Sequence, residues 1–160
     1  MSHNSGLPES ESSRWRTIID EAETLAAEQE SAGTETLVVH PGDVTPRLDD
    51  VFGLDVLASG SEFEAVKTLA ESYSFTRSHV YRHDGEARTF FLCVFEADST
   101  DEETDALAAA IYVPVYLSTE ALDMLYHETR ERDDLPVHVR PLTDDERATF
   151  TCTDPDLFFN

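Results

Sequence analysis

The sequence predicts one α+β domain, in which a mixed, mainly antiparallel β-sheet packs against about three α-helices. Three observations support this prediction. Segments with the periodicity of amphipathic helices are interspersed with short runs rich in β-branched and aromatic residues. A hairpin signal joins two of these runs, which favours antiparallel neighbours. At 160 residues, the chain has the length of a single domain, and no repeat or linker divides it.

The first helix is expected to begin near Ser12. Residues 1–11 are polar and show no periodicity, so they predict a disordered tail before a globular domain spanning residues 12–160. Apolar residues then follow the i, i+3, i+4, i+7 spacing of one helical face, and Gly33 is placed to end the helix. This face consists of Trp15, Ile18, Ile19, Ala22, Leu25 and Ala26.

Two short strands and a second helix should follow. Residues 36–40 are apolar and β-branched, and residues 54–57 form a similar run, whereas Pro46 is expected to keep the stretch between them irregular. Ser61 and Glu64 have the spacing of a capping box for the second helix. Its buried face is predicted to contain Phe63, Val66, Leu69, Ala70 and Tyr73.

The clearest hairpin signal is Asp84-Gly85, a dipeptide that supplies the two positive φ angles of a type I′ turn. This turn would pair Tyr81 with Arg88. The second strand, residues 89–95, is apolar on both faces. We therefore expect it in the middle of the sheet, with cover on each side.

Residues 99–113 fit more than one kind of structure. Residues 99–105 fit either an acidic loop or a one-turn helix, and residues 106–113 have the composition of a strand or a helix. We favour a strand for the latter because Pro114 would break a helix. Residues 119–132 predict a third helix that buries Leu122, Leu125 and Tyr126.

The C-terminal region predicts a hairpin and a docked tail. Residues 136–140 and 147–151 are strand-like and lie on either side of a short polar loop. The terminal Leu157, Phe158 and Phe159 are too apolar to remain in water. They either cap the core of this domain or form a docking segment for a partner.

The chain is strongly acidic, with 34 Asp and Glu, 11 Lys and Arg and a formal net charge of −23. Nine Phe, five Tyr and one Trp separate it from disordered acidic chains, which lack the apolar residues needed to fold. At molar salt the Debye length falls to roughly 3 Å, so the self-repulsion is screened. The composition therefore predicts a protein adapted to a salt-rich cytoplasm.

The same composition argues against several functions. Binding to nucleic acid requires a basic patch, and no window of the sequence contains one. No apolar stretch of about 18 residues could span a bilayer. Cys93 and Cys152 lack CxxC spacing, so we expect two reduced thiols and no metal or redox motif. No cofactor motif is present either.

Two pairs of residues are candidates for ligand binding. His40 and Asp43 lie where the first strand ends, a place where open α/β sheets hold ligands. The alternative is that Pro41-Gly42-Asp43 simply turns the chain, with Asp43 bonding backbone amides. His138 and Arg140 share one face of a strand and could bind a carboxylate or phosphate. The alternative is a polar sheet surface, with a structural Asp or Glu as the partner of Arg140.

Five short motifs together resemble a family of small acidic haloarchaeal proteins known as a domain of unknown function. The likeness covers most of residues 13–159 and implies a haloarchaeal source and a single domain, with no activity or catalytic residue to carry over. The motifs are His40-Pro41-Gly42-Asp43-Val44, Leu54-Asp55-Val56-Leu57, Val113-Pro114-Val115-Tyr116, His138-Val139-Arg140-Pro141-Leu142 and Asp154-Pro155-Asp156-Leu157-Phe158-Phe159.

Two functional hypotheses follow. The first is a non-catalytic module that binds another protein or a second copy of itself, through the aromatic tail or an exposed sheet edge. The second is a small-molecule sensor or enzyme whose pocket gathers His40, Asp43, His138 and Arg140 from two strand ends.

Overall fold

The computed structural model describes residues 9–99, 107–130, 132, 134–143, 146–153 and 158–159. Over these residues the chain is α+β, as the sequence predicts. Its elements are α1 (Glu9–Ser31), β1 (Glu35–Val38), β2 (Asp43–Arg47), β3 (Gly53–Leu57), α2 (Gly60–Ser72), β4 (Arg77–Asp84), β5 (Arg88–Asp98), β6 (Leu107–Ser118), α3 (Thr119–Thr129), β7 (Leu135–Arg140) and β8 (Ala148–Cys152).

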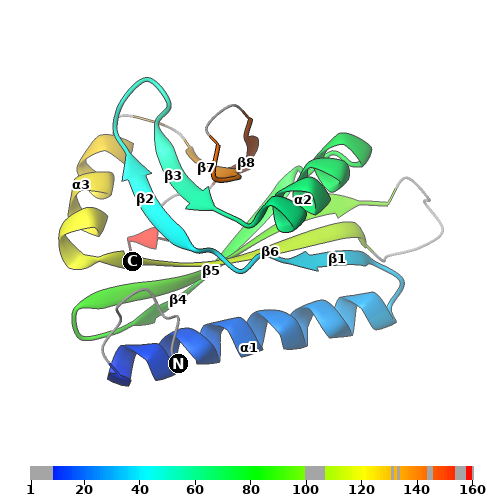
Figure 1. Cartoon of the computed structure of the whole chain (residues 1–160), viewed down its shortest axis with the longest axis horizontal. Helices are drawn as coiled ribbons and strands as arrows, with labels where there is room; N and C mark the ends of the chain where they lie inside the picture. Colours follow the sequence, from blue (N-terminus) through cyan, green and yellow to red (C-terminus); the bar gives the residue numbers. More distant parts are fainter. Residues whose placement is uncertain are drawn as a thin grey trace.

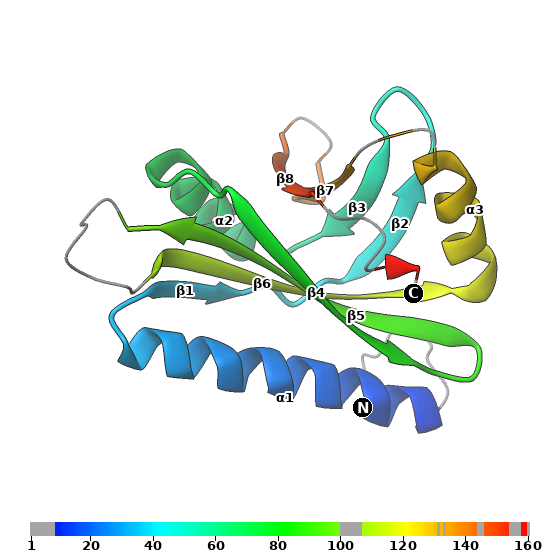
Figure 2. The same ribbon diagram turned by 180° about the vertical axis from the view of Figure 1, so that it is seen from behind.

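The strands form two sheets rather than the one we expected. Sheet A has the order β1-β6-β5-β4, and sheet B has the order β2-β3-β7-β8. Each sheet contains one parallel pair, β1 with β6 and β3 with β7, and its other pairs are antiparallel. Helix α1 covers one face of sheet A and sheet B covers the other, while α2 and α3 lie on either side of sheet B (Figures 1 and 2).

The chain passes from sheet A to sheet B at the predicted turn after β1. The Val39 N–H donates to the Tyr112 carbonyl of sheet A at 2.9 Å, and the Gly42 N–H donates to the Leu57 carbonyl of sheet B at 2.8 Å. Only His40 and Pro41 lie between these two bonds. We call these two residues the crossover.

Two apolar cores result, because the central strands β5 and β6 are buried on both faces. This confirms the central position predicted for residues 89–95. The core beneath α1 contains Trp15, Ile18, Ala22, Ala26, Phe90, Leu92, Val94, Ala110 and Tyr112. The core between the sheets receives the opposite faces of β5 and β6 together with Phe63, Val66 and Leu69 of α2.

The predicted register of the β4–β5 hairpin is wrong. Tyr81 pairs with Leu92 instead of Arg88, and the turn is formed by residues 86–87. The Gly85 N–H donates to the Arg88 carbonyl at 2.8 Å. A Cβ on Gly85 would lie 2.6 Å from that carbonyl oxygen, so the glycine permits a close approach of two backbones and does not supply a positive φ.

Two prolines lie inside strands. Pro46, expected in an irregular segment, belongs to β2, which is an edge strand and needs ladder hydrogen bonds on one side only. Pro114 lies in β6 beyond Tyr112, where the pairing with β1 stops. The missing N–H of each proline therefore causes little loss of sheet hydrogen bonding.

Several helix boundaries also differ from expectation. Helix α1 begins at Glu9, and Glu11, which we assigned to the tail, is buried; residues 1–8 lie outside the described residues. The N-cap of α2 is Ser59, whose Oγ accepts the Glu62 N–H at 3.2 Å, two residues earlier than predicted. Helix α3 buries Leu125, but Tyr126 remains 40 % exposed.

The aromatic tail docks onto its own domain. Phe158 is fully buried, with its ring centroid 4.7 Å from that of Phe91, and Phe159 packs edge-on against Tyr126 at 5.0 Å. This confirms the expected docking for these two residues. Leu157 and residues 100–106, which include most of the predicted acidic loop or helical turn, lie outside the described residues.

Candidate functional site

The outer face of sheet B carries a line of polar side chains. Thr45, Asp55, His138 and Thr149 are successive Cα partners across β2, β3, β7 and β8. We call these four residues the polar row. Their strand neighbours alternate to the other face and enter the core between the sheets; these are Leu54, Val56, Val137, Val139 and Phe150. The alternation thus places polar groups from all four strands on one face.

Asp55 and Arg140 form the charged part of this face. The Arg140 Nε donates to Asp55 Oδ2 at 2.8 Å, and its Nη1 donates to the Pro141 carbonyl at 3.2 Å. Asp55 is 9 % exposed, whereas the Arg140 side chain is 22 % exposed. The carboxylate therefore orients a guanidinium that still reaches solvent. Asp55 Oδ1 is buried and has no hydrogen-bond partner among the described residues.

His138 is held by both ring nitrogens. Its Nε2 lies 2.9 Å from the Phe52 carbonyl oxygen and its Nδ1 lies 2.8 Å from Thr149 Oγ1. Because a carbonyl oxygen only accepts, Nε2 carries a proton and donates it to the Phe52 carbonyl. His138 is buried, and both of its ring nitrogens are occupied by these contacts, so neither has a free position for a metal ion.

Gly53 makes room for this histidine. It has φ +136°, and a Cβ there would lie 3.1 Å from His138 Nε2 and 2.3 Å from the Pro136 carbonyl oxygen. A side chain at this position would therefore clash with the strand that carries His138.

The other two predicted residues are distributed differently. Asp43 lies on β2 two positions from Thr45, hence on the same outer face, and its Oδ2 accepts from Thr45 Oγ1 at 3.3 Å. His40 lies at the crossover and contacts the helices instead. Its Nδ1 is 2.6 Å from Glu62 Oε2 on α2, and its Nε2 is 3.4 Å from Glu23 Oε2 on α1.

The pKa of His40 reflects these contacts. Partial burial lowers the pKa, but the hydrogen bonds and negative charges of Glu62 and Glu23 outweigh that effect. The net pKa lies above its ordinary value of 6.5. His40 thus links three parts of the chain electrostatically, and its contacts are separate from those of His138 and Arg140, with which it was predicted to share a pocket.

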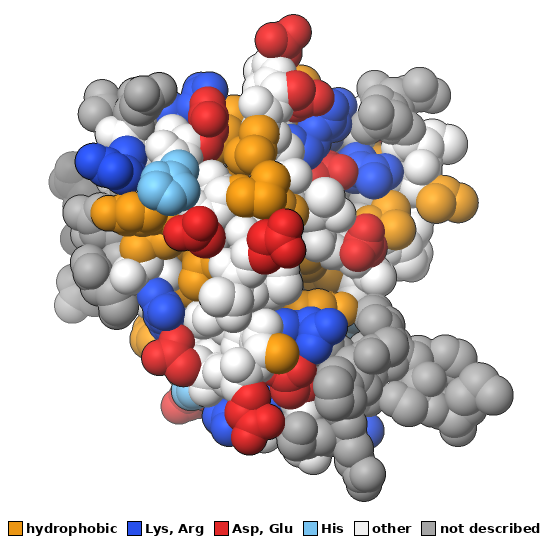
Figure 3. All heavy atoms as spheres, turned by 90° about the vertical axis from the view of Figure 1, so that its left-hand side faces the viewer, with side chains coloured by type: hydrophobic (Ala, Val, Ile, Leu, Met, Phe, Trp, Pro, Cys, Tyr) orange, Lys and Arg blue, Asp and Glu red, His pale blue; other side chains and the backbone are white. Residues whose placement is uncertain are grey.

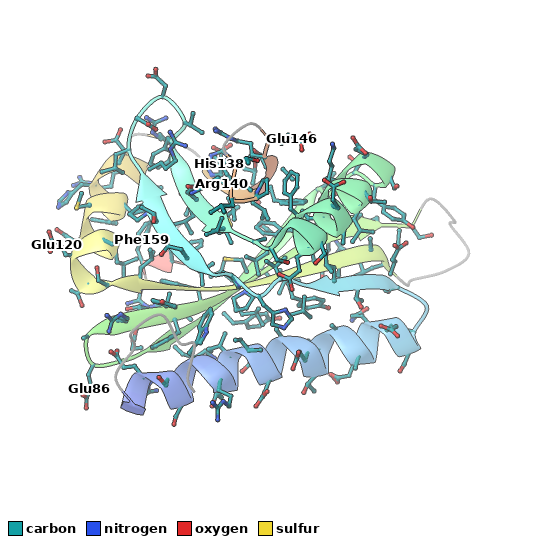
Figure 4. The ribbon with its side chains drawn as sticks, viewed as in Figure 1. Glu86, Glu120, His138, Arg140, Glu146 and Phe159 are labelled. Carbon is teal, nitrogen blue, oxygen red and sulfur yellow. The ribbon has the colours of Figure 1, made fainter. Side chains whose placement is uncertain are left out.

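Figure 4 shows His138 and Arg140 together on sheet B. Sequence reasoning anticipated a carboxylate partner for Arg140 but did not identify Asp55. One signal was present: Asp55 is the only charged residue in the otherwise apolar run Gly53–Leu57. A lone carboxylate in such a run needs a cation or several hydrogen-bond donors when it is buried.

A pocket of about 330 Å³ adjoins the polar row at His138. The guanidinium of Arg132 lies over the Phe52 ring, 4.1 Å from its centroid, within this pocket. The pocket is lined by Asp50, Val51, Phe52, Arg132, Asp134, Pro136 and His138. Its mixture of aromatic, cationic and acidic side chains could hold a small polar ligand.

Exposed hydrophobic side chains gather at the α3 end of the molecule, among charged ones (Figure 3). Met124 and Tyr126 of α3 are 45 % and 40 % exposed.

Over the part of the chain that the structure describes, no group of three or more His, Cys, Asp or Glu is arranged to hold a metal ion. Among the same residues, no helix combines the length and apolarity needed to cross a bilayer.

The architecture defines an α+β protein of two stacked mixed sheets, with a row of polar side chains on the outer face of sheet B. The chain belongs to DUF7529, a family of unknown function, whose model matches residues 3–160. This confirms the expected relationship to a domain of unknown function. Comparisons with characterised proteins and with solved structures gave no match.

Proposed function

We propose that this chain is a protein-binding module whose contact surface is the outer face of sheet B. The observation that carries the proposal is the Asp55–Arg140 pair, in which a buried carboxylate holds a partly exposed guanidinium at 2.8 Å. A side chain that is already oriented loses little conformational entropy on binding. Arg140 can therefore receive a carboxylate of a partner, a contact that arginine makes with well-defined geometry.

His138 contributes to the rigidity of this surface. Both of its ring nitrogens are engaged, by the Phe52 carbonyl and the Thr149 hydroxyl. The histidine thus fixes the surface around Arg140. A rigid polar surface flanked by exposed side chains is suited to recognition.

A small-molecule sensor is the second candidate, and the pocket beside His138 is the observation that favours it. A planar ligand would displace Arg132 from the Phe52 ring and stack there in its place. A thermal-shift screen of planar metabolites tests this candidate. Stabilisation that is abolished by Phe52→Leu would support the sensor over the protein-binding module.

We also propose that the protein works in the salt-rich cytoplasm of a haloarchaeon. The formal charge of −23 supports this setting, because molar salt screens the repulsion among 34 carboxylates. The same charge disfavours DNA, RNA and anionic membranes as partners. A protein partner, or a second copy of the chain, fits the charge better.

Affinity purification at molar KCl tests the binding surface. Thr45→Arg places a bulky cation on the outer face of sheet B, and Thr17→Arg makes the same change on an exposed position of α1. We expect the wild type and Thr17→Arg to retain a stoichiometric partner or a dimer, and Thr45→Arg to lose it. The proposal would be refuted if both variants kept the partner or dimer equally well. It would also be refuted if the wild type were a monomer that copurified with no partner.

A further inference from the structure

The two cysteines of the chain meet in the core between the sheets. Cys93 lies on β5 of sheet A and Cys152 on β8 of sheet B, and both side chains are fully buried free thiols. Both belong to the same hydrophobic cluster, and Cys152 is a main cause of the raised pKa of the Cys93 thiol. Two residues far apart in sequence thus bring their thiols to the same part of this core.

The neighbouring side chains fix this contact. Phe95 and Phe150 lie two positions from Cys93 and Cys152, on the same strand faces, and their rings stack with centroids 5.2 Å apart. At the end of β8, the Thr153 N–H donates to Ser78 Oγ of β4 at 3.3 Å. Strand β8 is therefore attached to sheet A on both sides of the cysteine pair.

We infer that Cys93 and Cys152 are a reversible disulfide site, and that oxidation covalently locks sheet B onto sheet A. The inference does not depend on the proposed binding function. It assigns a covalent modification to two residues that the sequence predicts to be reduced thiols. A disulfide requires that the two sulfur atoms can approach each other with little backbone movement. The stacked rings of Phe95 and Phe150, two positions from the cysteines, show that the two strand faces meet at this point.

The oxidation balances with a peroxide as the oxidant. The first thiol gives up its proton, its sulfur attacks a peroxide oxygen, and the O–O bond breaks to leave a sulfenic acid and a hydroxide, which takes up that proton and becomes water. The second sulfur then attacks the sulfenic sulfur, the S–O bond breaks, and the hydroxide leaves with the second thiol proton as water. Two thiols and one hydrogen peroxide thus become one disulfide and two waters, with sulfur oxidised and oxygen reduced.

Burial controls how readily this happens. The hydrogen bond to Cys152, burial and repulsion from Cys152 all raise the pKa of the Cys93 thiol. Little thiolate is present at neutral pH, so the reaction should be slow in the closed protein and faster as the pH rises. Reagents also need transient opening of the core, which makes the pair a sensor of sustained rather than brief oxidation.

The test uses the full chain in molar KCl, treated with hydrogen peroxide or refolded from urea in an oxidised glutathione buffer. Refolding gives the oxidant access before the core closes. We expect an intact mass lower by two hydrogens, a linked peptide containing Cys93 and Cys152, and a higher Tm that dithiothreitol reverses. Closing the long loop between the two residues accounts for the higher Tm, because the linked unfolded chain has fewer conformations.

Cys93→Ser and Cys152→Ser are matched controls, and each should abolish both the linked peptide and the Tm increase. The inference is wrong if the refolded wild type retains two free thiols under oxidising conditions. A link that forms only between two molecules, or one that lowers the Tm, would equally overturn it.

Discussion

The Nε atom of Arg140 lies 2.8 Å from Oδ2 of Asp55, while Oδ1 of the same carboxylate is buried without a hydrogen-bond partner among the described residues. The ion pair is thus half satisfied. Removing a carboxylate from water costs several kcal/mol, so its stabilisation depends strongly on the one bond it makes.

Arg140→Met should destabilise the protein by about 2 kcal/mol, because it leaves Asp55 buried and unpaired; the partial exposure of Arg140 keeps the loss below that of a fully buried pair. The double variant Asp55→Leu/Arg140→Met should recover most of that loss. Urea unfolding at molar KCl measures both. If the free energy lost in the double variant equalled the sum of the losses in Arg140→Met and in Asp55→Leu alone, the two residues would not be coupled.

Two glycines with positive φ provide a matched comparison. Gly33 has φ +98° and open space around its missing Cβ, so Gly33→Ala should cost only the backbone strain, about 1 kcal/mol. Gly53→Ala adds a clash with the Pro136 carbonyl and should cost at least about 3 kcal/mol. Equal losses in urea unfolding would show that β3 and β7 are not packed so closely.

His40 predicts a pH dependence of stability. Its pKa is raised in the folded state above 6.5, so its contribution is fully present below that value and is lost as the pH rises through the folded pKa. Stability should therefore fall as the pH rises above 6.5 and through the raised pKa of His40. Glu62→Gln keeps an acceptor for the His40 N–H but removes the charge, and should flatten this slope.

Glu64→Gln is the control for that measurement, because it neutralises an exposed carboxylate of the same helix away from His40. Urea unfolding at several pH values gives the slopes. A wild-type slope that persists unchanged in Glu62→Gln would rule out the His40–Glu62 contact as its cause.

Salt should control the stability of the whole domain. The net charge is −23, and the Debye length increases from roughly 3 Å at molar salt to about 30 Å at 0.01 M. We expect the Tm to fall by many degrees on dilution from molar to millimolar KCl, since self-repulsion destabilises the compact state. A thermal melt that does not change with KCl would contradict the proposed high-salt adaptation.

Local periodicity explains what the sequence could predict. The apolar face of α1 and the apolar run in β5 each depend on short-range patterns, and both lie where expected. The pairing of Asp55 with Arg140 joins residues 85 positions apart, and no local pattern encodes it. Sequence reasoning could state what kind of partner Arg140 needs, but only the parallel alignment of β3 and β7 shows which residue it is.

Gly85 shows which structural information local sequence patterns do not contain. Asp84-Gly85 has the composition of a type I′ turn, yet Gly85 is needed because the Arg88 carbonyl would lie 2.6 Å from a Cβ. The division of the strands into two sheets could not be predicted from the sequence either. Alternation indicates which side chains share a face, but it does not reveal that the strand pairing changes sheets at the crossover.

The parallel pairing of β3 with β7 also determines when the fold can form. Strand β3 can pair with β7 only after residues 135–140 have been synthesised. Strand β1 likewise has no partner until β6 is present. Contacts between distant segments slow folding, because a long loop has to close first. The ribosome will therefore have released nearly the whole chain before sheet B exists. Until then, the apolar faces of β3 and α2 lack the partners that bury them in the folded protein and can associate with other chains.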